Sequence, residues 1–398
     1  MADMKQLGTG QSFLQVAKDN LRNYSMFLML VVIFLVFSFF TGGINFTPRN
    51  INNIFIQNSY ILILAVGMVL VIIVGNIDLS VGSIAAFTGA ISAMVYNTGV
   101  GMPITIMATI AVGLVIGAYQ AFWIAYAKIP AFIVTLAGML MFRGLTYIIT
   151  RVTPISLRDE GFKQITSGSI SLEALTIDRV HYFALVVGII VSVIYVIMAL
   201  KARQDRVKHH FHVLPFGYFI MKSTLIVSLV LLLSWRFSLF RGIPTVVVVL
   251  AIVVSLFTFI TKKTVIGRYI YAVGGNARSA KLSGINSEMV VFTVHTIMGG
   301  LAGLAGLVFT GYMNSALPQA GDLFELDAIA ASFIGGASAS GGIGTIIGAV
   351  VGGLIMGVIN NGMSLMNIGA DWQYVVKALV LLFAVLYDIY TRRKGGLR

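Results

Sequence analysis

The residues of this sequence that could do chemistry are few, and they lie mainly in short polar stretches between long apolar runs. One such stretch, Thr261–Glu288, carries five Lys and Arg residues and a single acid. A break at 274–276 is followed by an amphipathic run that ends at Ser283 and Gly284. We expect a helix of one or two turns lying at the membrane surface there. The alternative is a solvated loop that only joins two spans.

Acidic residues stand at two points inside the apolar sequence. Asp78 lies between two apolar runs, where an ionised carboxylate at the membrane centre costs roughly 2.5–3.5 kcal/mol. In one interpretation, the side chain of Asp78 or Ser80 caps a helix that begins near Val81. In the other, the helix is broken here and its start lines a substrate path. The two roles are compatible. Glu325 and Asp327 repeat the pattern in the second half of the chain.

Groups that could act as nucleophiles or metal ligands are sparse. The sequence contains no cysteine, so thiolate chemistry, disulfides and Cys-based metal sites are excluded. His209, His210 and His212 cluster in a basic loop, but Asp205 is the only acid nearby, which disfavours a metal site. His295 stands alone on an apolar run, and we expect it to be packed or hydrogen-bonded. No phosphate-binding loop or hydrolase motif occurs, so we predict no catalytic residue, metal or cofactor in this chain.

Long apolar helices must position these residues. The chain is 58% hydrophobic and 10% charged, against about 25% charged residues in a soluble domain. We predict an all-α, polytopic transmembrane bundle of about ten to twelve spans, with a broken or re-entrant helix in each half, forming one domain over residues 1–398. The expected spans are 24–40, 59–74, 81–96, 104–127, 131–149, 180–200, 223–240, 243–260, 290–312, 343–359 and 375–387. Whether the short apolar piece 328–337 crosses fully or is re-entrant stays open.

The net charge of +13 does not indicate nucleic-acid binding, because the basic residues lie in the loops between apolar runs. Lys and Arg favour one side of the predicted bundle by roughly three to one, which places both termini and the loops 201–222 and 261–288 in the cytoplasm and 150–179 outside. Arg143 and Lys377 fall near span ends, where we interpret them as snorkelling or interfacial anchors.

Glycine accounts for 42 residues, several of them at every fourth position. Such spacing lets transmembrane helices pack backbone to backbone in a bundle that can slide, although plain packing explains any single glycine. These glycines are Gly113 and Gly117, Gly299 and Gly303, and Gly344, Gly348 and Gly352.

The energy source is missing from this chain. It has no phosphate loop, and it lacks the array of intramembrane carboxylates typical of a proton-driven pump. We therefore interpret it as a conduit with a separate motor that docks on Thr261–Glu288. The alternatives are a self-sufficient ion-coupled secondary transporter and, much less favoured, a membrane-embedded enzyme.

Four long motifs resemble the permease subunit of bacterial ABC importers for monosaccharides, the ribose, galactose and xylose group. They are GNIDLSVGSIAAFTGA (Gly75–Ala90), KIPAFIVTLAGMLMFRGLTYI (Lys128–Ile148), VGGNARSAKLSGIN (Val273–Asn286) and the glycine-rich run Phe324–Met363. The extra spans at 223–260 and the basic loop before them resemble the xylose-type and multiple-sugar-type members most.

This resemblance implies a homodimeric pore in the bacterial inner membrane, two copies of a cytoplasmic ATPase that binds ATP and Mg²⁺, and a periplasmic sugar-binding protein. By analogy, the binding protein contacts outer surfaces including 150–179, and the ATPase seats on a coupling loop. The predicted coupling residues are Gly274, Gly275, Asn276, Ala280, Lys281, Ser283 and Gly284. Polar residues suited to sugar hydroxyls along the expected path are Asn76, Asp78, Ser80, Ser83, Asn360 and Asn361. The sequence leaves the identity of the sugar open.

Overall fold

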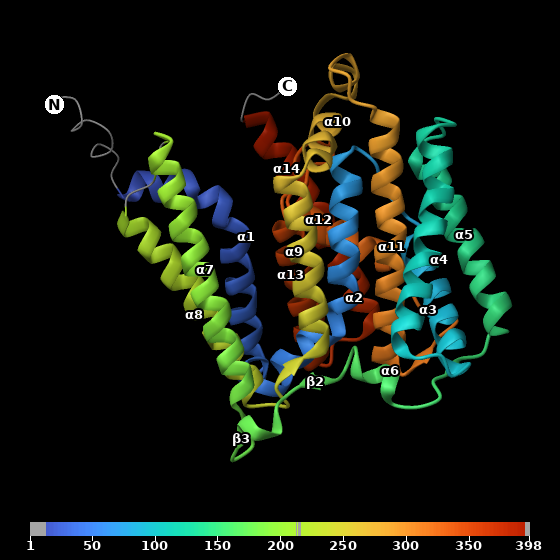
Figure 1. Cartoon of the computed structure of the whole chain (residues 1–398), viewed down its shortest axis with the longest axis horizontal. Helices are drawn as coiled ribbons and strands as arrows, with labels where there is room; N and C mark the ends of the chain where they lie inside the picture. Colours follow the sequence, from blue (N-terminus) through green and yellow to red (C-terminus); the bar gives the residue numbers. More distant parts are fainter. Residues whose placement is uncertain (1–12, 212, 214–215, 395–398) are drawn as a thin grey trace. The chain divides into compact units, whose positions relative to one another are not determined.

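The computed structural model of the chain describes residues 13–211, 213 and 216–394, and most of these residues are helical (Figure 1). The predicted all-α fold is confirmed. Among the described residues, eight helices are long and apolar enough to cross a membrane: α2, α4, α5, α7, α8, α9, α11 and α13. Met26–Phe40 and Val81–Asn97 form shorter apolar helices.

The helices are α1 (Phe13–Phe40), α2 (Pro48–Ile73), α3 (Val81–Asn97), α4 (Met102–Ala125), α5 (Ala131–Thr150), α6 (Gly161–Gln164), α7 (Tyr182–Lys208), α8 (Phe216–Ser238), α9 (Thr245–Lys263), α10 (Val265–Leu282), α11 (Ser287–Met313), α12 (Phe324–Ile334), α13 (Ile346–Leu365) and α14 (Ala370–Lys394). Short 3-10 turns lie at Ile44–Phe46 and Glu173–Leu175. The two-residue strands are β1 (Ile155–Ser156), β2 (Ser169–Ile170), β3 (Thr176–Ile177), β4 (Val180–His181), β5 (Ile243–Pro244) and β6 (Ser315–Ala316).

The chain packs as two compact units. Of the described residues, the smaller unit comprises those within 13–28, 46–52 and 169–243, and in it α7 packs along α8. The larger unit comprises residues 29–45, 53–168 and 244–394 and holds most of the buried residues. In the larger unit β1 pairs with β6 through Ile155 and Ala316, which ties part of the predicted outer segment to the chain that follows α11.

Helix α2 forms the centre of the larger unit. Every residue from Ile61 to Val74 is buried, as expected for a helix that is apolar on all sides. A Cβ atom added to Gly67 would lie 2.5 Å from Sδ of Met298 on α11, and one added to Gly353 of α13 would lie 2.6 Å from a methyl group of Leu62. The core of this unit is therefore built around α2.

Helix α11 packs on α4 through the predicted glycine positions, and Figure 1 shows it between α2 and α4. A Cβ atom on Gly299 would collide with the carbonyl oxygen of Gly113, and one on Gly117 would lie 2.6 Å from the carbonyl oxygen of His295. The backbones of the two helices are therefore in direct contact, which confirms the expected close packing at these glycines.

Helix α12 is too short to cross the membrane on its own. Its 11 residues extend about 16 Å at 1.5 Å per residue, whereas the hydrocarbon core is about 30 Å thick. It begins after Leu323, whose φ is +58°, and ends at Gly335 and Gly336, where φ of Gly336 is +84°. The piece 328–337, left open by the sequence, is therefore too short to cross the membrane as a helix by itself.

Candidate functional site

The basic segment Thr261–Glu288 is largely helical, so the prediction that it is a loop is wrong for most of its length. Helix α9 continues to Lys263, and the Thr264 side chain accepts a hydrogen bond from the Gly267 amide at 3.2 Å, which caps the start of α10. The first part of α10 continues as a helix because residues on one face, including Ile270 and Val273, are buried against the bundle.

A kink divides α10 at Asn276, where φ is −160° and ψ is 98°. The Asn276 side chain accepts a hydrogen bond from the Ser279 amide at 2.9 Å and so starts a second short helix, 277–282. That helix ends at Ser283 and at Gly284, whose φ of +82° is the left-handed conformation that glycine adopts most easily. The predicted short helix and its end are confirmed.

The tip of α10 is exposed and carries both apolar and basic side chains. Leu282 is 86% exposed, and the basic Arg278 and Lys281 precede it on the same short helix. Of the seven predicted coupling residues, two face inward: Gly274 is half-buried and Ala280 is buried. The exposed ones are Gly275, Asn276, Lys281, Ser283 and Gly284.

The base of the tip contacts both interruptions in the helical bundle. A Cβ atom on Gly274 would collide with the carbonyl oxygen of Ile73, the last residue of α2, and would lie 2.9 Å from the Gly342 amide. That amide donates to the Ile73 carbonyl at 2.8 Å, and the Tyr271 hydroxyl donates to the Gly344 carbonyl at 2.8 Å. The segment α10 thus touches the turn after α2 and the turn between α12 and α13 at one place.

Two ion pairs join the end of this segment to its surroundings. Glu288 pairs with Lys128, between α4 and α5, at 2.8 Å and with Lys281 at 3.4 Å. The lysine side chains are 63% and 69% exposed, so each pair contributes about 1 kcal/mol or less. They orient the segment more than they stabilise the fold.

A buried polar cluster lies at the interruption before α3. Asp78 is 2% exposed, and its Oδ1 atom accepts hydrogen bonds from the Ser80 amide at 2.8 Å and the Ser80 hydroxyl at 2.6 Å. The Ser80 hydroxyl also lies 3.0 Å from Oε1 of Gln120 on α4. Ser80 precedes α3 as predicted, but its side chain makes no cap hydrogen bond. The predicted cap of α3 by Asp78 or Ser80 is therefore replaced by a turn closed between these two residues.

His295 completes this cluster from α11. The Asn76 amide donates to Nε2 of His295 at 3.2 Å, and Nδ1 of His295 lies 3.7 Å from Oδ2 of Asp78. The expectation that His295 is hydrogen-bonded is confirmed. Its partners were not predicted, because Asn76 lies 219 positions earlier in the chain and no local pattern connects the two.

The starts of the two short helices meet inside the bundle. A Cβ atom on Gly82 of α3 would collide with the Gly321 carbonyl and lie 2.6 Å from Oε2 of Glu325, in the first turn of α12. The positive ends of two helix dipoles therefore lie together, with a buried acidic side chain between them. Arg143 donates to the Ala320 carbonyl at 2.5 Å. The interpretation of Arg143 as an outward snorkelling residue is wrong, since it fixes the chain that leads into α12.

The six predicted path residues fall into two groups. Asn76, Asp78, Ser80 and Ser83 lie at or just after the interruption before α3. Asn360 and Asn361 lie near the end of α13, one turn beyond Gly357, whose added Cβ atom would be 2.8 Å from Cγ of Asn58. Asn58 precedes the end of α2 by 15 residues, or about 22 Å along the helix, so the structure does not bring the two groups together.

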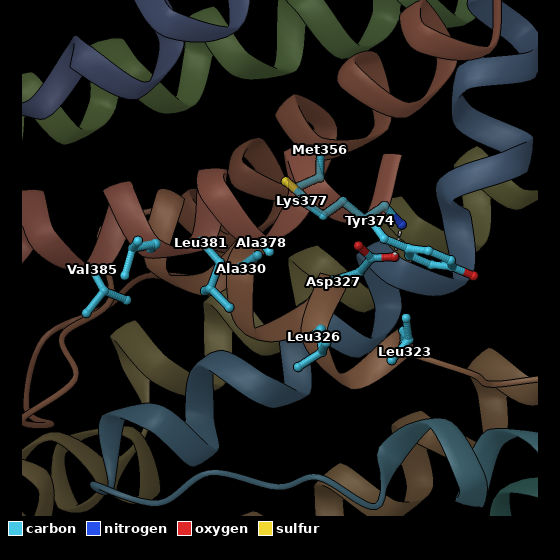
Figure 2. Close-up of a pocket in the computed structure, with 11 residues that line it drawn as sticks. Leu323, Leu326, Asp327, Ala330, Met356, Tyr374, Lys377, Ala378, Leu381 and Val385 are labelled. Atoms are coloured by element: carbon cyan, nitrogen blue, oxygen red, sulfur yellow. Dashed lines mark hydrogen bonds and ion pairs between the residues drawn. The ribbon is translucent and has the colours of Figure 1, made fainter. Parts of the chain in front are cut away.

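A cavity of about 430 Å³ lies between α12, α13 and α14 (Figure 2). Its lining is mainly apolar, with Tyr374 and one ion pair as polar groups. Figure 2 shows the side chains of Lys377 and Asp327 directed toward each other, and their Nζ–Oδ2 distance is 2.9 Å. The interpretation of Lys377 as an interfacial anchor is therefore wrong.

The histidine cluster is described only in part. His209 and His210 lie where α7 ends, and His212 lies outside the described residues. Within the described part of the chain, no group of three His, Asp or Glu side chains could hold a metal ion.

These features are those of a multi-pass membrane transport protein. It has apolar helices of membrane-crossing length, two interrupted helices that meet inside the bundle, and the exposed tip of α10. The chain belongs to the family described as branched-chain amino acid transport system / permease component, which matches residues 50–385. It is thus a permease subunit of the bacterial inner membrane.

The chain is similar to the xylose transport system permease protein XylH of Haemophilus influenzae, with 39% identity over 376 residues that cover 94% of this chain and 98% of the relative. XylH of Escherichia coli strain K12 is 38% identical over 388 residues, which are 97% and 96% of the two chains. The ribose import permease protein RbsC of the same strain is 35% identical over 343 residues, 86% of each chain. No solved structure matches the chain significantly. The expected xylose-type resemblance is confirmed.

Proposed function

We propose that this chain is the membrane-spanning subunit of an ATP-driven importer and translocates a monosaccharide, a pentose such as xylose in the first instance. The sequence similarity to xylose permeases along nearly the whole chain supports the substrate class. The observation that carries the mechanism is the contact of Gly274 with both Ile73 and Gly342, because it joins one surface segment to both interrupted helices.

In this proposal a cytoplasmic ATPase seats on the exposed tip of α10, residues 275–284. Nucleotide-driven closure of the ATPase displaces α10, and the contacts at Ile73 and Gly342 transmit the movement to the turns beside α3 and α12. At the glycine contacts between α11 and α4 backbone lies against backbone, and in this proposal the two helices slide past each other there. ATP and Mg²⁺ act on the partner ATPase, and this chain contributes no catalytic residue.

The orientation follows from charge: α10 and both termini face the cytoplasm, and residues 150–179 face outward, where a periplasmic sugar-binding protein delivers the substrate. Two copies of the chain form the conduit. Hydroxyl-binding side chains near the helix interruptions, including Asn76, Asp78 and Ser80, contact the sugar in passage, and Asn360 and Asn361 do so at another level of the bundle.

Uptake of labelled sugars into proteoliposomes tests this proposal. The chain is reconstituted alone, with its ATPase, or with its ATPase and binding protein. We expect uptake only when both partners and ATP are present, with pentoses preferred over hexoses, and no ATP hydrolysis by the chain alone. Uptake by the chain alone under an ion gradient would instead establish a secondary transporter.

A further inference from the structure

One donor and one acceptor face each other inside the bundle without forming a hydrogen bond. The Asn76 amide donates to Nε2 of His295, so in the neutral imidazole the proton is on Nδ1. That Nδ1 atom has no hydrogen-bond partner among the described residues, and the His295 side chain is completely buried. It points toward Oδ2 of Asp78, at 3.7 Å.

The separation is longer than a hydrogen bond allows. An N–H group and a carboxylate bond at about 2.7–2.9 Å, so the two side chains are about 0.8 Å too far apart. The other oxygen of Asp78 is engaged by Ser80, which holds the carboxylate in place. A buried donor without a partner raises the free energy of the folded state by roughly 1–3 kcal/mol. An arrangement in which Nδ1 of His295 bonds to Oδ2 of Asp78 removes this cost.

The gap lies between the turn before α3, which carries Asp78, and α11, which carries His295. His295 is eight residues into α11, about 12 Å from its start, and that start follows the α10 tip after a short turn. The Ser287 hydroxyl donates to the Ala277 carbonyl of the tip at 3.4 Å. At His295 the α11 backbone lies on Gly117 of α4, so no side chain at that point opposes a small slide.

We propose that His295 is a positioning residue for transport. When the partner ATPase displaces α10, α11 slides along α4, Nδ1 of His295 closes on Oδ2 of Asp78, and the start of α3 is held in the position that passes the sugar. This inference rests on the proposed function and adds the link between the cytoplasmic tip and the buried interruption.

Paired substitutions at one position test it. Asn at position 295 places its amide near the position of Nδ1 and keeps a donor for Asp78, whereas Gln places its amide near Nε2 and keeps only the contact with Asn76. We therefore compare H295N, H295Q and, as a control on the same helix, T296V, whose hydroxyl bonds only within α11. Each variant is reconstituted with the ATPase and binding protein, and uptake and ATP hydrolysis are measured on equal amounts of assembled complex.

We expect H295Q to import about tenfold less sugar per ATP hydrolysed, while H295N and T296V stay within about twofold of the wild type. In D78N/H295Q the loss should be no greater than in the more affected single variant, because both remove the same contact. Equal ratios in H295N and H295Q, or losses that add in the double variant, would overturn the role of His295.

The two proposals fail differently. If the wild-type complex hydrolyses ATP but imports no sugar, the proposed function is wrong, and this inference is wrong with it. If the wild-type complex imports sugar and H295Q keeps the wild-type ratio, only the role of His295 is wrong. Should H295Q assemble poorly, the D78N variant with the native histidine replaces it, and a wild-type ratio in D78N overturns the inference.

Discussion

The backbone of Gly274 lies directly on the carbonyl oxygen of Ile73. The part of α10 just before its kink therefore contacts the end of α2, the most deeply buried helix. No side chain fits between them. The neighbouring Gly275 differs, since an added Cβ atom there would meet nothing within 4 Å. The two adjacent glycines are therefore packed differently, Gly274 against the bundle and Gly275 on the exposed side.

Gly274→Ala should reduce sugar uptake by the assembled importer by about tenfold or more, because its Cβ atom cannot be placed without moving the Ile73 or Gly342 backbone. Gly144→Ala in α5, where an added Cβ atom meets nothing within 4 Å and which lies outside the proposed ATPase seat, should stay within about twofold. Labelled-sugar uptake per assembled complex measures both. Equal effects of the two substitutions would show that the backbone contact at Gly274 is not needed.

Leu282→Asp should weaken binding of the ATPase about tenfold or more, since a leucine that becomes buried at an interface contributes about 1.5–3 kcal/mol. Co-purification with the ATPase and its titration against the permease measure the change. Leu172→Asp, at another exposed leucine in the predicted outer segment, should leave the ATPase affinity unchanged. Wild-type affinity in the Leu282 variant would argue against docking on the α10 tip.

Lys377→Met should destabilise the permease by about 3 kcal/mol, because it leaves the buried carboxylate of Asp327 without its partner. The figure is at the lower end for a buried pair, since the Lys377 side chain is 23% exposed. Thermal unfolding in detergent measures the loss. The double variant D327N/K377M should recover most of it, and a loss equal to the sum of the single variants would contradict a direct pairing.

The attachment of the outer segment to α3 should depend on acidity. The Tyr96 hydroxyl donates to Oδ1 of Asp159 at 2.5 Å, and with the Gly161 amide it holds the pKa of that carboxyl below its usual value of 3.8. Because the folded-state pKa is the lower one, this contact stabilises the segment above the usual carboxyl pKa and is lost as the pH falls through the folded-state pKa.

Tyr96→Phe removes the stronger of these hydrogen bonds. During acid titration its 155–168 segment should become sensitive to an acid-active protease at a higher pH than in the wild type. Identical cleavage profiles would mean that Asp159 does not hold the segment.

Composition and apolar run length were sufficient to predict the helical bundle, and the Gly284 turn marked the end of the α10 tip. Local sequence could not show where long polar side chains point. Arg143 and Lys377 each lie near a span end, which favours anchoring, yet their partners Ala320 and Asp327 are distant in the sequence. The length and charge of a side chain do not show whether it extends to the lipid interface or to a buried acceptor. Both interpretations were wrong for this reason.

The enclosure of α2 has a consequence for biosynthesis. This helix emerges early from the ribosome, but the residues that cover it, such as Met298 of α11 and Gly353 of α13, are translated much later. Until these residues are translated, the surface of α2 that they later cover is exposed to the lipid tails of the bilayer. A nascent chain that stops after α9 therefore leaves the centre of the protein unassembled, whatever number of helices it has already inserted.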